Sequence, residues 1–266
     1  MSELNNIAKK IIQKGKGILA ADESTGTMTK RLESVGVSST PENRLLFRNT
    51  LFSSDAMKSY IGGVILYDET IKQKSLSKNK IPELISGTGA VPGIKVDTGA
   101  KILANSTEEK ITEGLDGLRE RLKEYYKLGA RFTKWRAVYK ITESYPSKLS
   151  IHSNAHALAR YAALVQESGM VPIIEPEVLM DGNHDVEECF NKTSEVIKKC
   201  FDELNKNKID LSGTILKPNM MSPGSSSTKK SSSEEIAKKT LDCKKKNVPS
   251  EVTGIAFLSG GQSEIE

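Results

Sequence analysis

The sequence predicts an α/β protein built as a (β/α)8 barrel. Short apolar segments that end in a polar or charged residue recur along the chain, and amphipathic helical segments separate the later ones. This alternation of strand and helix is typical of a parallel sheet. Because no glycine-rich dinucleotide fingerprint follows the first strand, a barrel is favoured over a doubly wound sheet. We expect a single domain over residues 1–266.

Seven segments are expected to form strands, because each is short, apolar and bounded by glycine, proline or a charge. After the first two, they follow one another at intervals of roughly 30–40 residues, about the length of one βαβ unit. The segments are residues 17–24, 61–70, 93–97, 131–138, 171–178, 213–219 and 252–261.

Helices are expected between the later strands, where apolar residues recur at helical spacing. The expected helices are residues 112–130, 149–169, 185–207 and 234–246. In the first of them, Leu115, Leu118 and Leu122 share one face, and Gly129 is placed to end the helix. The serine-rich segment 220–235 is expected to be a flexible, solvated loop, because it cannot bury enough apolar surface to order itself.

The composition indicates a soluble, cytoplasmic protein. The net charge of +5 is spread among interleaved acids, which suits an anionic substrate better than a nucleic acid. Three cysteines without CxxC spacing predict neither a disulfide framework nor a thiolate zinc site. Neither a secretory signal nor an apolar run long enough to span a bilayer is found, so we expect no membrane contact.

Charged residues stand at the carboxyl ends of the expected strands, which converge at one end of a barrel. Lys217, where the sixth segment runs out, either reaches into solvent or acts as a nucleophile. In a barrel it would face Lys134 and Glu175. A second ammonium group nearby disfavours positive charge on Lys217, and a neutral amine can add to a ketone and form an imine.

The other charges of this cluster suit the remaining steps of imine chemistry. Glu175 and Lys134 can move the protons that loss of water requires. Asp22 can take the proton from the hydroxyl that becomes an aldehyde when the neighbouring carbon–carbon bond breaks. The alternative is a buried ion-pair network at the barrel mouth, and these residues alone do not name a substrate.

Two groups of residues are candidate anion sites. Backbone N–H groups at Ser259, Gly260 and Gly261 follow the seventh strand, where barrels bind phosphate, although SGG is also compatible with a plain turn. A second anion site across the mouth would use Ser24, Thr27, Arg31 and Lys95, each of which alone is compatible with a surface or capping role.

The histidines do not favour a metal site. His152 and His156 have a spacing that can hold a metal ion, but no acid stands beside them in the metalloprotease pattern, so a role on the helix surface or in the core is favoured. His184 is interpreted as a loop residue. We therefore expect no metal and no other cofactor.

Seven motifs, taken in order, resemble those of class I fructose-1,6-bisphosphate aldolases. They are GKGILAADESTGTMTKRL, GGVILYDET, GIKVD, KWR, VPIIEPEVLMDGNHD, GTILKPNM and TGIAFLSGGQS. Of these, ILKPN and EPE are highly specific, and SGG is not. The resemblance implies a (β/α)8 barrel and a cytosolic enzyme, usually a homotetramer. Such an enzyme cleaves fructose 1,6-bisphosphate into dihydroxyacetone phosphate and glyceraldehyde 3-phosphate without a metal.

The resemblance also implies residue roles. Lys217 would form the imine, Glu175 with Glu177 would move protons, Lys134 would assist, and Asp22 would assist carbon–carbon cleavage. The residues implied to bind substrate and its phosphates are Thr27 (usually serine in the family), Arg31, Lys95, Arg136, Ser259, Gly260 and Gly261.

The chain departs from the family pattern at two places. Ser212 stands where the family usually has glutamate, a change expected to affect packing. The sequence stops at Glu266, after the seventh strand, so we expect a barrel without the family's eighth strand and C-terminal tyrosine tail. Unpaired edges on the first and seventh strands would then invite association with another chain.

Two other functions stay open from the sequence. One is a truncated, catalytically impaired relative that acts as a binding or scaffold protein. The other is a Schiff-base lyase of the transaldolase type, acting on a different sugar phosphate. The ADES and SGG motifs together argue against the second, because two phosphate sites suit a bisphosphate.

Overall fold

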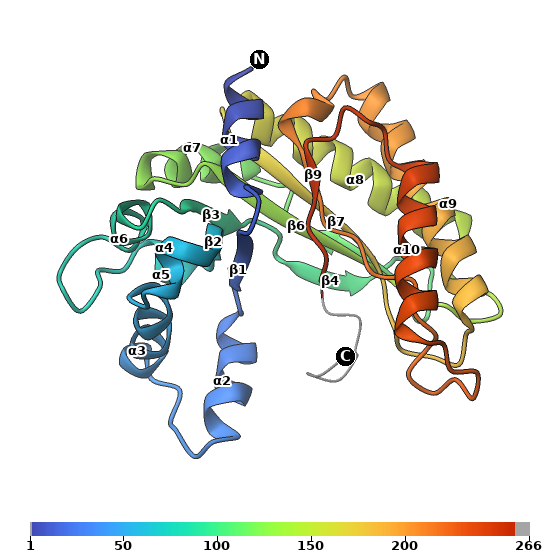
Figure 1. Ribbon diagram of the computed structural model, residues 1–266, viewed down its shortest axis with the longest axis horizontal. Helices are drawn as coiled ribbons and strands as arrows, with labels where there is room; N and C mark the ends of the chain where they lie inside the picture. The colour runs from blue at the N-terminus through green and yellow to red at the C-terminus, as the bar shows by residue number, and fades with distance from the viewer. Residues whose placement is uncertain (1, 259–266) are drawn as a thin grey trace.

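A curled parallel sheet forms the centre of the molecule, and helices cover its outer side (Figure 1). The computed structural model describes residues 2–258. The strands of the sheet follow one another in chain order. They are β1 (Gly17–Ala21), β2 (Ile61–Leu66), β3 (Val91–Lys95), β6 (Phe132–Tyr139), β7 (Val171–Val178), β8 (Ile215–Leu216) and β9 (Gly254–Ile255). Each overlaps one of the seven segments predicted to be strands, so the α/β class with a parallel sheet is confirmed.

Within residues 2–258, β1 and β9 are the outer strands of this sheet, and no ladder joins them. A separate hairpin, β4 (Gly99–Ile102) with β5 (Lys110–Glu113), follows β3. The helices are α1 (Glu3–Ile11), α2 (Thr25–Glu33), α3 (Pro41–Phe52), α4 (Ala56–Tyr60), α5 (Asp68–Ile71), α6 (Ile81–Gly87), α7 (Leu118–Leu128), α8 (Lys148–Glu167), α9 (Val186–Lys206) and α10 (Ser233–Asn247). A 3-10 turn, η1 (Leu211–Gly213), precedes β8. None of the helices in the described part of the chain has the length and apolar character that crossing a membrane requires.

Three of the four predicted helices match α8, α9 and α10 to within two residues. The fourth prediction was wrong at its start, because α7 begins at Leu118 rather than at residue 112. Thr112 belongs to β5, and its hydroxyl donates to the Arg136 carbonyl at 2.7 Å. Gly117 has a left-handed backbone (φ 62°) and separates hairpin from helix. Gly129 ends α7 as predicted, with φ 112°.

The amino end of the curled sheet is filled by apolar side chains. Ala8 and Ile11 of α1 pack against Ile65, Phe132 and Ile173 from the inner face of the sheet. A second, larger core lies between the outer face of the sheet and the surrounding helices. Because α1 and its partners occupy the amino end, polar side chains on the inner face are left to gather at the carboxyl end.

The close approach of α1 to β2 depends on Gly62. A Cβ atom at this position would lie 2.0 Å from the carbonyl oxygen of Ile11. Relief would require α1 to move, so Gly62→Ala is expected to lower the free energy of unfolding by about 3 kcal/mol. Urea denaturation measures this change. The control is Gly87→Ala, since a Cβ at Gly87 meets no atom within 4 Å, and its midpoint should stay near that of the parent. Equal urea midpoints for the two variants would contradict the close packing of α1 against Gly62.

The serine-rich segment 220–235 is more ordered at its start than predicted. Met221 is fully buried, and the Gly224 N–H donates to the His184 carbonyl at 2.9 Å. A Cβ on Gly224 would lie 2.3 Å from the Gly182 carbonyl oxygen, so only glycine allows this approach. His184 lies outside the helices and strands, as expected, but its side chain is buried. The prediction of a solvated loop was therefore wrong for residues 221–227.

Candidate active site

Four charged side chains form a continuous ion-pair chain at the carboxyl end of the sheet. The Lys134 ammonium lies 2.8 Å from the Asp22 carboxylate and 3.4 Å from that of Glu175. The other oxygen of Glu175 accepts a hydrogen bond from Lys217 Nζ at 2.7 Å. We call Asp22, Lys134, Glu175 and Lys217 the charge chain. It joins residues that the sequence places up to 195 positions apart, from 22 to 217.

Strand geometry explains how these side chains meet. Residues of β6 alternate between the two faces of the sheet, so Lys134 and Arg136 point inward while Trp135 and Ala137 enter the outer core. The parallel register pairs Arg136 with Glu175 of β7. The Lys217 N–H donates to the Ile174 carbonyl at 2.8 Å, which continues the ladder of β8 up to Pro218.

The two central members of the charge chain are buried. Lys134 is 5% exposed and Glu175 2% exposed, and charges at that depth require partners. Burial alone would lower the pKa of Lys134, but the carboxylates of Glu175, Asp22 and Asp97 outweigh it and raise that pKa above its ordinary value. Lys134 is therefore a fixed ammonium group at neutral pH. Lys134 and Lys217 lie near each other as expected, but the Glu175 carboxylate lies between their ammonium groups.

Glu175 has unused capacity to accept a hydrogen bond. Its Oε2 atom is buried and faces Lys134 at 3.4 Å, yet it makes no hydrogen bond of normal geometry within residues 2–258. A carboxylate oxygen in that position can accept a hydrogen bond from a hydroxyl group of a bound ligand.

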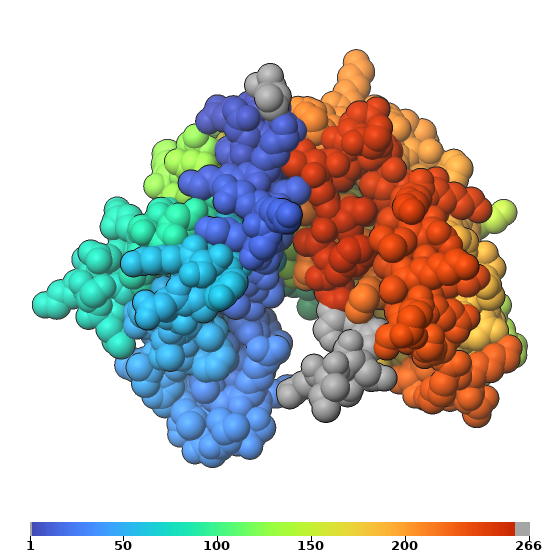
Figure 2. Space-filling model, viewed as in Figure 1, coloured from blue at the N-terminus to red at the C-terminus, as the bar shows by residue number. Residues whose placement is uncertain are grey.

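A cavity of about 780 Å³ opens beside the charge chain. In the space-filling view the surface is hollowed between the α2–α3 region and the α10 region (Figure 2). Six cationic and four anionic side chains line the cavity, so it suits an anionic ligand. The predicted site residues that line it are Asp22, Ser24, Thr27, Arg31, Lys95, Lys134 and Arg136.

Helix α2 carries one wall of this cavity. Ser24 is its N-cap, and the Ser24 hydroxyl accepts a hydrogen bond from the Thr27 N–H at 3.4 Å. Arg31, one turn further on, forms an ion pair with Glu23. The buried guanidinium of Arg48 donates to the Glu23 carbonyl at 2.6 Å and so fixes the backbone next to Asp22.

Two acidic residues hold the cationic side chains of the opposite wall. Asp97 lies 2.7 Å from Lys95 Nζ, and Glu177 pairs with the guanidinium of Arg136. Asp97 was not predicted as a site residue, although its position at the end of GIKVD is the same signal that identified Asp22. Lys72, which directly follows α5, and Arg121 of α7 also line the cavity, but the sequence carries no signal for them.

Lys217 borders a second, smaller cavity of about 290 Å³, which shares Ala20 of β1 with the larger one. Ile18 and Ile65 line it from β1 and β2, and Ile255 lines it from β9. The side chain of Lys217 is 16% exposed, against 6% for that of Lys134. Of the two ammonium groups, the more accessible one is therefore at Lys217.

The remaining predicted residues do not add to this geometry. Ser259, Gly260 and Gly261 lie outside the described residues. His152 and His156 lie on α8 and face Glu203 of α9, at 3.8 Å and 3.4 Å. Within residues 2–258, no group of histidine, cysteine and acidic side chains has a geometry that could hold a metal ion.

A family model for class I fructose-bisphosphate aldolase matches residues 3–266. The chain belongs to this family. The resemblance of its motifs to class I aldolases is thereby confirmed. The chain is 49% identical, over 99% of its length and 79% of the relative's, to the "Probable fructose-bisphosphate aldolase class 1" of Xanthomonas axonopodis pv. citri (strain 306). It is 50% identical to "Fructose-bisphosphate aldolase C" of Carassius auratus, over 99% of this chain and 73% of that protein.

The fold is that of a solved aldolase. The structure of fructose-bisphosphate aldolase from Plasmodium falciparum, in complex with TRAP and a small molecule inhibitor, matches with a TM-score of 0.97 and 44% identity. The match covers 99% of this chain and 76% of that one. The α/β barrel-like aldolase fold predicted from the sequence is thus supported over the matched 99% of this chain.

Proposed function

We propose that this aldolase cleaves fructose 1,6-bisphosphate into dihydroxyacetone phosphate and glyceraldehyde 3-phosphate through an imine on Lys217. The observation that carries the proposal is the position of Glu175. Its carboxylate contacts Lys217 at 2.7 Å and faces Lys134 at 3.4 Å, and Lys134 lines the basic cavity of about 780 Å³. An amine with a carboxylate in hydrogen-bond contact is the arrangement that imine formation requires.

In the first half of the proposed reaction, Lys217 passes a proton to Glu175 and its neutral amine adds to the C2 ketone. Glu175 then returns a proton to the hydroxyl that leaves as water, and an iminium ion remains. The fixed ammonium of Lys134 stays 3.4 Å from the Glu175 carboxylate and so holds it in place beside Lys217.

In the second half, Asp22 removes the proton of the C4 hydroxyl. The C3–C4 bond breaks, its electron pair moves to the iminium to form an enamine, and the aldehyde leaves. Protonation of C3 and addition of water then release the ketone product and restore Lys217. The contact of Asp22 with Lys134 at 2.8 Å holds the Asp22 carboxylate in position to accept that proton.

The phosphates would be bound at two places. Arg31, Lys95 and Arg136, with the hydroxyls of Ser24 and Thr27, would bind one phosphate, and Glu177 would position Arg136. The backbone N–H groups of Ser259, Gly260 and Gly261 would bind the other.

Membership of this family also bears on the domain organisation, the oligomeric state and the location of the enzyme. We propose a single barrel domain, a homo-oligomer and a cytosolic location. Support for the location comes from "Fructose-bisphosphate aldolase 4, cytosolic" of Arabidopsis thaliana, which is 50% identical to this chain over 252 residues.

Borohydride trapping tests the proposal. The chain is incubated with dihydroxyacetone phosphate and borohydride, and the product is read by intact mass and peptide mapping. The expected result is a single adduct on Lys217, together with cleavage of fructose 1,6-bisphosphate in a coupled assay. A folded chain that forms no adduct would favour the alternative of a binding or scaffold protein.

Glu175→Gln is expected to lower kcat by about 10²–10³-fold, because an amide cannot accept or return the proton that imine formation moves. The matched control is Glu203→Gln, which also replaces a buried carboxylate held by two lysines, Lys199 and Lys206. This control should retain the parental kcat. An equal loss in both variants would mean that Glu175 serves stability rather than proton transfer.

A further inference from the structure

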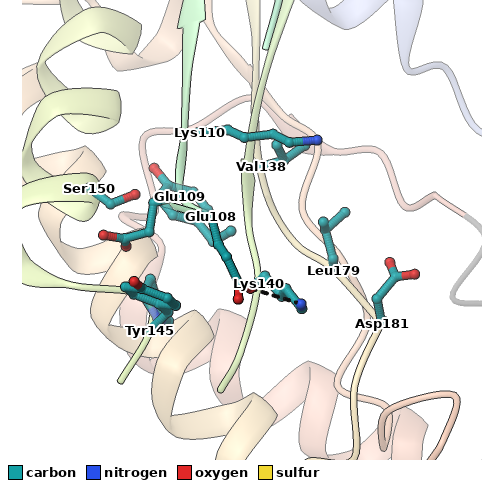
Figure 3. Close-up of a pocket in the computed structure, with 11 residues that line it drawn as sticks. Glu108, Glu109, Lys110, Val138, Lys140, Tyr145, Ser150, Leu179 and Asp181 are labelled. Atoms are coloured by element: carbon teal, nitrogen blue, oxygen red, sulfur yellow. Dashed lines mark hydrogen bonds and ion pairs between the residues drawn. The ribbon is translucent and has the colours of Figure 1, made fainter. Parts of the chain in front are cut away.

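A separate cavity of about 310 Å³ lies beyond the ends of β6 and β7 (Figure 3). Val138 and Tyr139 at the end of β6 line it, together with Leu179, whose N–H donates to the Tyr139 carbonyl at 2.7 Å. The opposite side is lined by residues that flank the start of α8. This volume is within the usual range of small-molecule sites, about 300–1,000 Å³. The aldolase reaction proposed above uses none of the residues that line it.

The walls of this cavity are apolar enough to hold a ring. Val138 and Leu179 lie on one side and Tyr145 on another, and Pro146 also lines the cavity. Ser150 adds one polar group to this interior. The residue is 1% exposed, its hydroxyl points into the cavity in Figure 3, and within residues 2–258 that hydroxyl has no hydrogen-bond partner.

Charged groups gather at the mouth, on the side away from Ser150 (Figure 3). Glu108 and Lys140 neutralise each other in an ion pair of 3.1 Å. In contrast, the Lys110 ammonium and the Asp181 carboxylate have no ion-pair partner in the described part of the chain, although both line the cavity. The mouth therefore offers one cation and one anion that are free to bind a ligand.

The carboxylate of Glu109 already has partners within the protein and is not available to a ligand. It accepts hydrogen bonds, each at 2.7 Å, from both the N–H and the hydroxyl of Ser147, the residue that caps the start of α8. The cavity therefore has one ion pair at its mouth, one cation and one anion without an ion-pair partner in the described part of the chain, and one buried hydroxyl.

We propose that this cavity binds a free aromatic α-amino acid with a ring hydroxyl, of the tyrosine type. The ring would lie against Val138 and Leu179, and its hydroxyl would reach Ser150. The ammonium group of the ligand would pair with Asp181 and its carboxylate with Lys110. A sugar bisphosphate lacks both the ring and the positive charge, so the two cavities select different ligands.

Three probes test the ligand class: L-tyrosine, tyramine without the carboxylate, and 3-(4-hydroxyphenyl)propionate without the amine. Binding to the full chain is measured by calorimetry and saturation-transfer NMR, with saturating inorganic phosphate to fill the basic cavity. L-tyrosine is expected to bind saturably, and each truncated probe about 10-fold more weakly, as the loss of one charge-assisted contact implies.

Variants test the location. Asp181→Asn should weaken L-tyrosine binding about 10-fold and should not strengthen the binding of tyramine. Lys110→Gln should likewise weaken L-tyrosine binding about 10-fold, because it removes the partner of the ligand's carboxylate. Ser150→Ala should remove the preference for L-tyrosine over L-phenylalanine. Asp202→Asn, outside this cavity, is the control and should change nothing.

Three results would overturn the proposal. The first is the absence of saturable L-tyrosine binding by a folded chain. The second is binding that responds equally to Asp181→Asn and Asp202→Asn, and the third is equal binding of all three probes. Any of these results would show that this cavity does not recognise an amino acid.

Discussion

Lys217→Met is expected to lose cleavage activity by a factor of about 10⁴ or more and to form no borohydride-trapped adduct. Methionine is similar in length to lysine and fits an environment whose other walls include Ile18 and Ile65. Glu175 keeps Lys134 as its partner, so the remaining charge chain stays paired. The variant therefore removes the nucleophile with little other change.

The control for this variant is Lys199→Met, which removes another lysine that contacts a buried carboxylate, that of Glu203 at 3.0 Å. It should cleave fructose 1,6-bisphosphate at the parental rate. Steady-state cleavage and trapped mass are measured on both proteins. A Lys217→Met protein with undiminished cleavage would refute the assignment of the nucleophile.

Lys244→Met is expected to raise the free energy of unfolding at pH 7 by about 3 kcal/mol. Lys244 is 4% exposed, and its Nζ atom has no hydrogen-bond partner within residues 2–258. Burial lowers the pKa of this amine from 10.5 to about 8. A shift of that size corresponds to roughly 3 kcal/mol of stability lost when the group must carry a proton in the folded state.

The pH dependence of this effect has a definite sign. Between about pH 8 and 10.5 the unfolded chain binds the Lys244 proton and the folded chain does not, so raising the pH stabilises the parent. Below about pH 8 the full penalty is present. The advantage of the methionine variant should therefore be largest near neutral pH and shrink as the pH rises to 10.5.

Urea denaturation over this pH range measures the difference between the two proteins. Lys245→Met is the control, because Lys245 is exposed on the same helix, and its effect should stay within about 0.5 kcal/mol. If Lys244→Met and Lys245→Met have the same small effect at pH 7, the Lys244 amine is not held in an apolar environment in solution.

Much of the site could be predicted from the sequence because its residues lie at the carboxyl ends of strands. Asp22, Lys134, Glu175 and Lys217 each interrupt or follow an apolar segment, and parallel strands bring such positions to one edge. The charge chain confirms that these four meet. Their order of contact, with Glu175 between two lysines, depends on side-chain geometry that spacing does not reveal.

Other features could not be predicted because they depend on contacts between distant segments. Arg48 of α3 supports the backbone of Glu23, and no local pattern around either residue indicates it. Thr112 looked helical because of the leucines that follow it, but pairing with the β4 strand decides its conformation. The order of residues 221–227 comes from backbone contacts with residues 182–184, which a serine-rich composition does not report.

The alternation of signs along the charge chain has a consequence for the covalent intermediates. Two carboxylates balance two ammonium groups in the resting site. An iminium on Lys217 would carry the same positive charge as the ammonium it replaces, so the balance survives. A neutral carbinolamine keeps it as well, because Glu175 then holds the proton that left Lys217. The charge chain can therefore pass through each covalent intermediate without leaving an unmatched charge in a buried environment, which would be costly.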